Sequence, residues 1–166
     1  MKRVITFSFL MILILFILTY LFFPNNAIGI YDENKNTVKE ILVQNESKIC
    51  IEYDHSVMKT PVRDIFHIKD NKELLLKKTE YKSFGAGLPS DVDEDIKKEN
   101  GIFVKDNINQ RFEKISLRVG KVANHRLIID ENKKIHLSDY IDSKDLVKIK
   151  PTSITNIKAF ILERRN

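Results

Sequence analysis

The N-terminal segment is the feature that most constrains this chain. Met1-Lys2-Arg3 is followed by twenty residues, Val4–Phe23, which contain no charged residue, no glycine and no proline. At about 1.5 Å per residue, a helix of this length spans roughly 30 Å, the thickness of the hydrocarbon core of a bilayer. The rest of the chain, about 140 of the 166 residues, is long enough to form one modest hydrophobic core.

Two interpretations of this segment compete. A cleaved signal peptide has a shorter apolar stretch, of about 7–15 residues, followed by a small-x-small cleavage site. Here Ala27 is small but Asn25 is a poor partner for it, so we expect an uncleaved anchor that contacts the lipid bilayer through residues 4–23. The positive-inside rule keeps the two basic residues at the N-terminus in the cytoplasm. We therefore expect a single-pass protein of the cell membrane with residues 24–166 outside it.

Charge and cysteine content narrow the possible partners. The formal net charge of +5 is spread along the chain. In nucleic-acid-binding domains the lysines and arginines instead cluster into a basic stripe, often with aromatic residues between them. We expect no nucleic-acid partner. Cys50 is the only cysteine, so no disulfide forms within the chain, and its alternating context KICIEY predicts a buried apolar role.

Period-two alternation of apolar residues predicts a β-rich extracytoplasmic domain over residues 38–150. Residues 24–37 are interpreted as a polar tether and residues 151–166 as a C-terminal extension. Several short strands joined by tight turns predict an all-β fold, either an antiparallel β-sandwich or a small barrel. One short surface helix and the single N-terminal transmembrane helix complete the expected architecture.

Turn-forming clusters predict how the strands pair. Three hairpins are expected: Val38–Val43 with Lys48–Tyr53, Val62–Ile68 with Glu73–Tyr81, and Arg126–Ile129 with Lys134–Leu137. Further strands are expected at Ile115–Val119, Leu146–Ile149 and Ile157–Leu162. The surface helix is placed over SDVDEDIKKENG, because Ser90 can cap its start and Gly101 follows its end.

Three stretches interrupt the alternation and are candidate binding sites. The first, DHSVMKTPVRD, groups His55, Ser56, Lys59 and Thr60 ahead of Pro61. Its functional interpretation is a polar pocket in which His55 carries a proton or donates to a ligand. The alternative is a connection whose side chains satisfy its own backbone.

The second stretch, SFGAGLP, holds two of the five glycines of the chain. Ser83, Gly85 and Gly87 form a loop whose uncovered N–H groups can face an anion, although a tight strand exit explains the same residues. The third stretch, LRVGKVANHRL, contributes Arg118, Asn124 and His125.

No motif in the sequence indicates a cofactor, a metal or a catalytic residue. The four histidines lack HxH and HExxH spacing, which argues against zinc. Ser56 beside His55 does not make a catalytic triad, because neighbours on a strand point to opposite faces. No GxSxG is present, and the glycines at 85 and 87 lack nucleotide-binding spacing.

The same stretches resemble the bacterial domain-of-unknown-function family eighteen-fifty. The resemblance rests on HSVMKTPVRDIF, SFGAGLP, LRVGKVANHRL and the later IHLSDYI, in this order over roughly residues 48–150. It implies no catalytic residue. It implies a companion of tripartite (TRAP-type) transporters, particularly those with a TAXI-type solute-binding protein. Nothing is implied for PTSITNIKAFILERRN, at the end of the chain.

We therefore expect an extracytoplasmic accessory protein that binds a transporter subunit, a solute-binding protein or a small anionic solute. One alternative is a hydrolase-like envelope enzyme that uses His55 and the Gly85–Gly87 loop. A structural envelope protein is the other.

Overall fold

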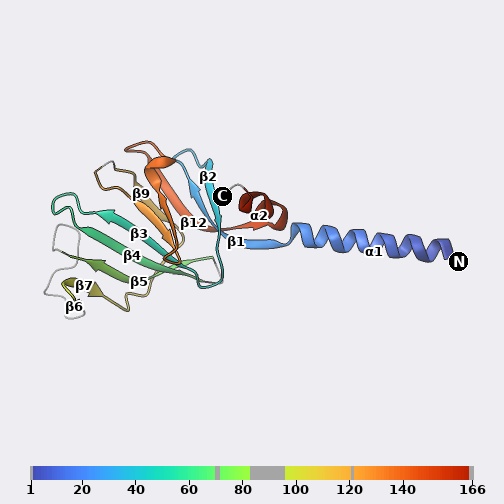
Figure 1. Cartoon of the computed structure of the whole chain (residues 1–166), viewed down its shortest axis with the longest axis horizontal. Coiled ribbons are helices and arrows are strands. Elements are labelled where there is room, and N and C mark those ends of the chain that lie inside the picture. Colours follow the sequence, from blue (N-terminus) through green and yellow to red (C-terminus); the bar gives the residue numbers. More distant parts are fainter. Residues whose placement is uncertain (1, 70–71, 83–95, 121, 165–166) are drawn as a thin grey trace.

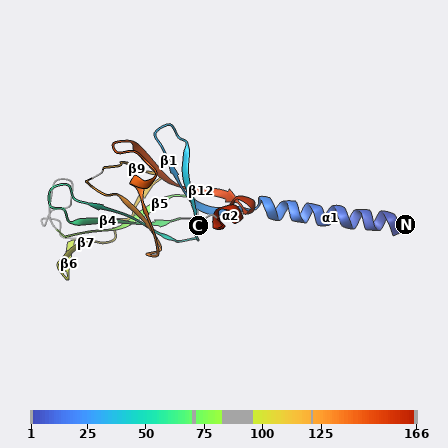
Figure 2. The same ribbon diagram turned by 45° about the horizontal axis from the view of Figure 1, so that its top comes forward.

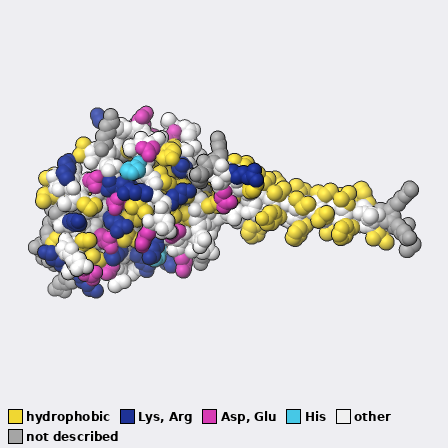
Figure 3. Space-filling view, viewed as in Figure 1, with side chains coloured by type: hydrophobic (Ala, Val, Ile, Leu, Met, Phe, Trp, Pro, Cys, Tyr) yellow, Lys and Arg dark blue, Asp and Glu magenta, His cyan; other side chains and the backbone are white. Residues whose placement is uncertain are grey.

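A computed structural model describes residues 2–69, 72–82, 96–120 and 122–164. It shows a β-rich head at the end of one long helix, α1 (Lys2–Phe22) (Figure 1). Over Val4–Phe22 this helix is long and apolar enough to cross a membrane, and none of it is buried against the head. Hydrophobic side chains cover its surface, whereas the head shows mixed charges (Figure 3).

Two antiparallel sheets face each other in the head (Figures 1 and 2). The smaller sheet has the order β2-β1-β12-β9, and the larger has the order β11-β10-β3-β4-β5-β7-β6, with β8 also paired to β5. The smaller sheet is made of β1 (Pro24–Tyr31), β2 (Thr37–Leu42), β9 (Ile115–Arg118) and β12 (Leu146–Thr155). The larger sheet is made of β3 (Lys48–Asp54), β4 (Pro61–Ile68), β5 (Leu74–Tyr81), β6 (Ile96–Glu99), β7 (Ile102–Lys105), β8 (Gln110–Phe112), β10 (Arg126–Ile129) and β11 (Lys133–His136). The predicted β-sandwich is confirmed.

The core lies between the two sheets and is mostly isoleucine. Ile28 and Ile30 from β1 meet Ile49 and Ile51 from β3, all four at least 96% buried. A short 3₁₀ helix, η1 (Leu137–Asp139), closes one edge through the fully buried Leu137. β-Branched side chains suit this arrangement because they pack well on a pleated, half-buried surface.

A second, smaller apolar cluster lies on the outer face of the smaller sheet. The helix α2 (Asn156–Glu163) covers this face, and its Ala159 packs with Ala27 of β1 and Ile154 of β12. Thr155 caps the helix by accepting a hydrogen bond from the backbone N–H of Lys158. The helix lies at the end of the head where α1 enters (Figure 1).

Several sequence predictions are corrected here. Pro24–Tyr31 is not a polar tether but an inner strand, paired along its length with β12 and over residues 27–31 with β2. The extension after residue 150 completes β12 and forms α2, so Ile157–Leu162 is helical rather than extended. The polar residues Asn25 and Asn26 at the start of β1 conceal a strand whose residues 27–30 are all buried, between the core and α2. The apolar residues of α2 lie on both its packed and its exposed side, so the sequence shows no clear helical period there.

The three predicted hairpins have different outcomes. The β4–β5 and β10–β11 hairpins are confirmed. The β2–β3 hairpin is wrong, because the chain crosses from one sheet to the other between these strands. The expected helix after Ser90 lies partly outside the described residues, and its second half is the strand Ile96–Glu99 instead.

Candidate functional site

The connection between β3 and β4 is a closed turn that hydrogen-bonds to itself. The His55 N–H donates to the Thr60 carbonyl at 2.8 Å, and the Lys59 N–H donates to the His55 carbonyl at 2.9 Å. The buried His55 ring accepts hydrogen bonds at Nδ1 from the N–H groups of Val57 and Met58, each at 3.3 Å. These bonds favour the structural interpretation of His55 and leave only Nε2 for proton transfer, while Ser56 and Lys59 are exposed.

The turn before β10 lies against the start of this connection. The Asp54 N–H donates to the Ala123 carbonyl at 2.7 Å, and the Asn124 side-chain amide donates to the Asp54 carboxylate at 3.4 Å. Asn124 adopts a left-handed backbone, with φ of 46°, which asparagine tolerates better than most residues. The His125 ring packs on Tyr53 with a centroid distance of 5.7 Å.

The remaining predicted residues lie elsewhere or are not described. Arg118 is exposed on β9, in the other sheet, and donates to the Lys144 carbonyl at 3.0 Å. It is therefore not among the residues that contact Asp54 between the two turns. Ser83, Gly85 and Gly87 lie outside the described residues.

A ladder of alternating charge crosses the outer face of the larger sheet beside these turns. Arg126, Glu52, Arg63 and Glu80 occupy directly opposed positions on β10, β3, β4 and β5. Arg126 Nε lies 2.7 Å from Glu52, and Arg63 lies 3.5 Å from Glu52 and 3.3 Å from Glu80. Arg126 is 7% exposed, so this end of the ladder is structural.

A pocket of about 280 Å³, whose wall combines polar and apolar side chains, opens between the two sheets. Its wall includes Tyr53, Asp64 and His125 on one side and Ser116 of β9 on the other. Asp64 occupies a core-facing position on β4, and its Oδ1 accepts a hydrogen bond from the Thr79 hydroxyl at 2.8 Å. The arrangement places a carboxyl, a phenol and an imidazole around one opening.

Burial changes the titration of these three groups. It raises the pKa of Asp64, which the Thr79 hydrogen bond opposes, and it raises the pKa of Tyr53, as does the nearby Asp64 charge. Burial and the neighbouring Arg126 lower the pKa of His125. Each shift favours the uncharged form, so the pocket suits a neutral, hydrogen-bonding environment.

Tyr53, Asp64 and Thr79 were missed by the sequence prediction. A signal was present, because Val62, Asp64, Phe66 and Ile68 alternate on one face of a strand, and only Asp64 in this series is charged. A charged residue within a core-facing series marks a polar site inside the fold.

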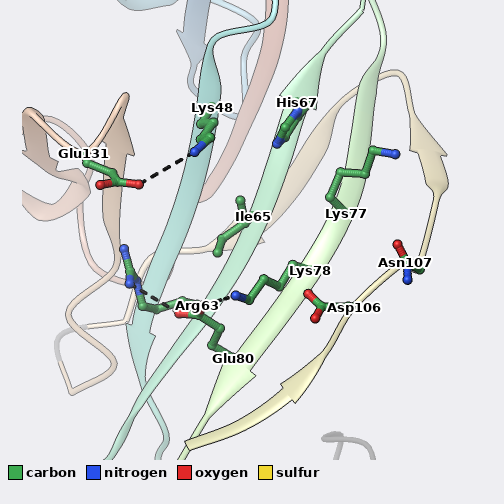
Figure 4. Close-up of a pocket in the computed structure, with 10 residues that line it drawn as sticks. All are labelled: Lys48, Arg63, Ile65, His67, Lys77, Lys78, Glu80, Asp106, Asn107 and Glu131. Atoms are coloured by element: carbon green, nitrogen blue, oxygen red, sulfur yellow. Dashed lines mark hydrogen bonds and ion pairs between the residues drawn. The ribbon is translucent and has the colours of Figure 1, made fainter. Parts of the chain in front are cut away.

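A second opening, a groove of about 360 Å³, lies on the outer face of the larger sheet (Figure 4). Lys48, His67 and Lys77 come from three adjacent strands and lie along its upper part (Figure 4). Lys77 is the extra residue of an irregularity in the β4–β5 register, so both Lys77 and Lys78 line the groove.

The positive charges at this end of the groove are only partly neutralised. Lys48 lies 3.9 Å from the exposed Glu131, and the Lys77 ammonium donates to the Asn109 side chain at 2.6 Å. Lys78, by contrast, is paired with Glu80 at 2.8 Å. Burial lowers the pKa of His67, and Lys48, Lys77 and Lys69 lower it further. Among the described residues, no group of three or more His, Cys, Asp or Glu side chains is placed to hold a metal ion.

The fold and these openings define a class of protein: a β-sandwich head, with a pocket of mixed polarity between its sheets, at the end of one apolar helix. The chain belongs to the family described as "Domain of unknown function (DUF1850)", which matches residues 49–137, more than half of its length. The match covers the strands from β3, without its first residue, to β11, and it includes every residue that lines the two openings except Lys48. Comparison with curated proteins and with solved structures finds no match to this chain.

Proposed function

We propose that this protein is a membrane-anchored accessory protein of a TRAP-type transporter with a TAXI-type binding protein, and that its head lies outside the membrane. The junction between α1 and the head carries the proposal. β1 begins at Pro24, with one residue between it and the end of α1 at Phe22, and is an inner strand of the smaller sheet. A head joined in this way stays close to the membrane surface, where its effective concentration toward a membrane partner is high.

The same junction supports an anchor that is kept rather than cleaved. Ala27, the residue that suits a signal-peptide cleavage site, is 1% exposed and paired with both Thr152 and Leu42. Cleavage there would remove half of a strand that is paired on both sides. The particular partner, a TRAP-type transporter, is what the resemblance to this family implies.

Affinity purification of the full-length protein from detergent-solubilised membranes tests this role. We expect transporter subunits to be recovered with it, and solute uptake to fall when the gene is deleted. A variant in which an unrelated transmembrane helix replaces residues 1–23 distinguishes contacts of the head from contacts of α1. Recovery of no subunit, together with unchanged uptake in the deletion strain, would contradict the proposal.

A small anionic solute is the second candidate ligand, and the groove at Lys48, His67 and Lys77 favours it. A bound anion would stabilise the protonated imidazole, so addition of inorganic phosphate should raise the pKa of His67 measured by NMR. Lys77→Gln should weaken this response, whereas Lys35→Gln, on an exposed turn of the other sheet, should not. A His67 titration curve that phosphate leaves unchanged would rule out this groove as the anion site.

A further inference from the structure

The helix α2 carries an apolar face that nothing in the head covers. Ile157, Phe160 and Ile161 are 38%, 55% and 49% exposed, and their spacing of three and four residues places them on one side of the helix. The opposite side, with Ala159 and Leu162, packs on the smaller sheet. The exposed side chains are therefore not needed to hold the helix in place.

Hydrogen bonds fix the start of α2 to the end of α1. The Asn156 backbone N–H donates to the Phe23 carbonyl at 3.1 Å, and its side-chain amide donates to the Tyr20 carbonyl at 2.7 Å. The two helices lie beside each other in both views (Figures 1 and 2). If α1 spans the bilayer, its last turn marks the membrane surface, and α2 lies at that level.

The uncovered face of α2 continues the lipid-facing surface of α1. Tyr20 and Leu21 of α1 line the same hollow, of about 920 Å³, as Ile157, Phe160 and Ile161 of α2. Three side chains are too few for the roughly 800 Å² that each partner buries in a stable protein interface. They are enough for a short helix that is already held at the surface to enter the headgroup region.

The charges near this face suit the boundary between lipid and water. The Arg164 guanidinium lies 4.4 Å from the centre of the Phe160 ring, so the arginine can keep its charge at the headgroups while the ring enters the lipid. Lys158 forms an ion pair with Glu40 of β2 and stays with the head. The aromatic residues at the end of α1, among them Tyr20 and Phe22, are exposed at the same level.

We propose that α2 is a membrane-surface helix, whose Ile157, Phe160 and Ile161 side chains enter the outer leaflet beside α1. This inference rests on the proposed membrane anchor, because an α1 removed by cleavage would leave α2 in water. It gives the C-terminal segment a role: with α1 it makes a second contact with the membrane and fixes the tilt of the head.

The chain contains no tryptophan, so single tryptophans can report depth in the full-length protein. Phe160→Trp, Leu13→Trp in α1 and Val57→Trp are each reconstituted in phosphatidylcholine vesicles whose acyl chains carry no bromine, bromine near the headgroups, or bromine near the bilayer centre, the depth expected for Leu13. Val57 is 76% exposed in the β3–β4 connection, which lies at the end of the head away from α1 (Figure 1). We expect bromine near the headgroups to reduce Phe160→Trp emission by about half or more, since the indole would lie within the leaflet. Val57→Trp emission should not change.

The three reporters separate the possible failures. Quenching of Leu13→Trp without quenching of Phe160→Trp overturns the inference and leaves the anchor standing, with a partner protein as the alternative cover for this face. Equal quenching of Phe160→Trp and Val57→Trp also overturns it, because the head would then adsorb without orientation. An unquenched Leu13→Trp contradicts the anchor itself and the inference with it. As a further check, Ile157→Gln with Ile161→Gln should shift the Phe160→Trp emission toward the red.

Discussion

At the scale of single residues, Arg126 is a buried cation whose removal should destabilise the head. It is buried between Glu52 at 2.7 Å and Asp54 at 2.9 Å, and it lowers the pKa of Asp54 mainly through their hydrogen bond. Arg126→Met should lower the free energy of unfolding by about 2–3 kcal/mol at pH 7, because two partly buried carboxylates lose their cation. Urea titration measures this difference.

The exposed Arg118 is the matched control for this substitution. Arg118→Met loses one hydrogen bond to a carbonyl and should change stability by no more than about 0.5 kcal/mol. The pKa of Asp54 is lower in the folded protein than in the unfolded chain, so its carboxylate stabilises the fold at pH values above the unfolded pKa. This contribution is lost as the pH falls through the folded pKa. The cost of Arg126→Met should therefore shrink toward pH 3, and a cost that is independent of pH would contradict the ion-pair explanation.

Asp64 should produce the opposite pH dependence. Burial raises its pKa, so the folded protein holds the proton to higher pH than the unfolded chain does. The contribution of the protonated Asp64 to stability is fully present below its unfolded pKa, and it is lost as the pH rises through its folded pKa. Asp64→Asn keeps an oxygen that accepts from the Thr79 hydroxyl and removes the buried charge. It should match the wild type near pH 3 and exceed its stability at pH 7 by about 1 kcal/mol.

The comparison is made by urea unfolding between pH 3 and pH 8, with Asp139→Asn as the exposed control. If the wild type instead becomes more stable than Asp64→Asn as the pH rises, a cation compensates the Asp64 carboxylate, and the pocket does not favour the uncharged form.

At the scale of elements, the sequence predicted strands well and their partners less well. The β4–β5 hairpin was predictable because a turn cluster separates two alternating runs. The placement of β2 in one sheet and β3 in the other was not predictable, because a strand shows the same alternation of apolar and polar residues in either sheet. Likewise, Asp64 and His125 come together only because β4 and the turn before β10 pack on opposite sides of β3, a register that no local pattern encodes.

The strand β1 is a core strand, although the residues at its start are polar. PNNAIGIY has the polar start of a tether, yet Ile28 and Ile30 are fully buried. A head that begins at Pro24 keeps the whole strand and should fold cooperatively. A head that begins at Ile28 loses the pairing of residues 24–27 with β12 and the Ala27 contact with α2.

Thermal unfolding followed by circular dichroism compares these two heads. The shorter one should unfold at least about 3 °C lower, as expected for a loss of 1 kcal/mol or more in a domain of this size. Equal midpoints would show that β1 contributes little before Ile28, and cleavage after Ala27 would again be compatible with the fold.

At the scale of the whole molecule, the proposed anchor puts the head outside the membrane, and cysteine labelling tests this topology. The native Cys50 is 6% exposed and burial raises its pKa, so it should react slowly with maleimides. Ser56→Cys, on the exposed β3–β4 turn, adds one reactive thiol at the far end of the head. A membrane-impermeant maleimide added to whole cells should label Ser56→Cys, leave wild type unlabelled, and reach Lys2→Cys only after lysis. Labelled protein should sediment with the membranes. Labelling of Lys2→Cys alone would invert the topology, and labelled protein in the soluble fraction would show that α1 is removed.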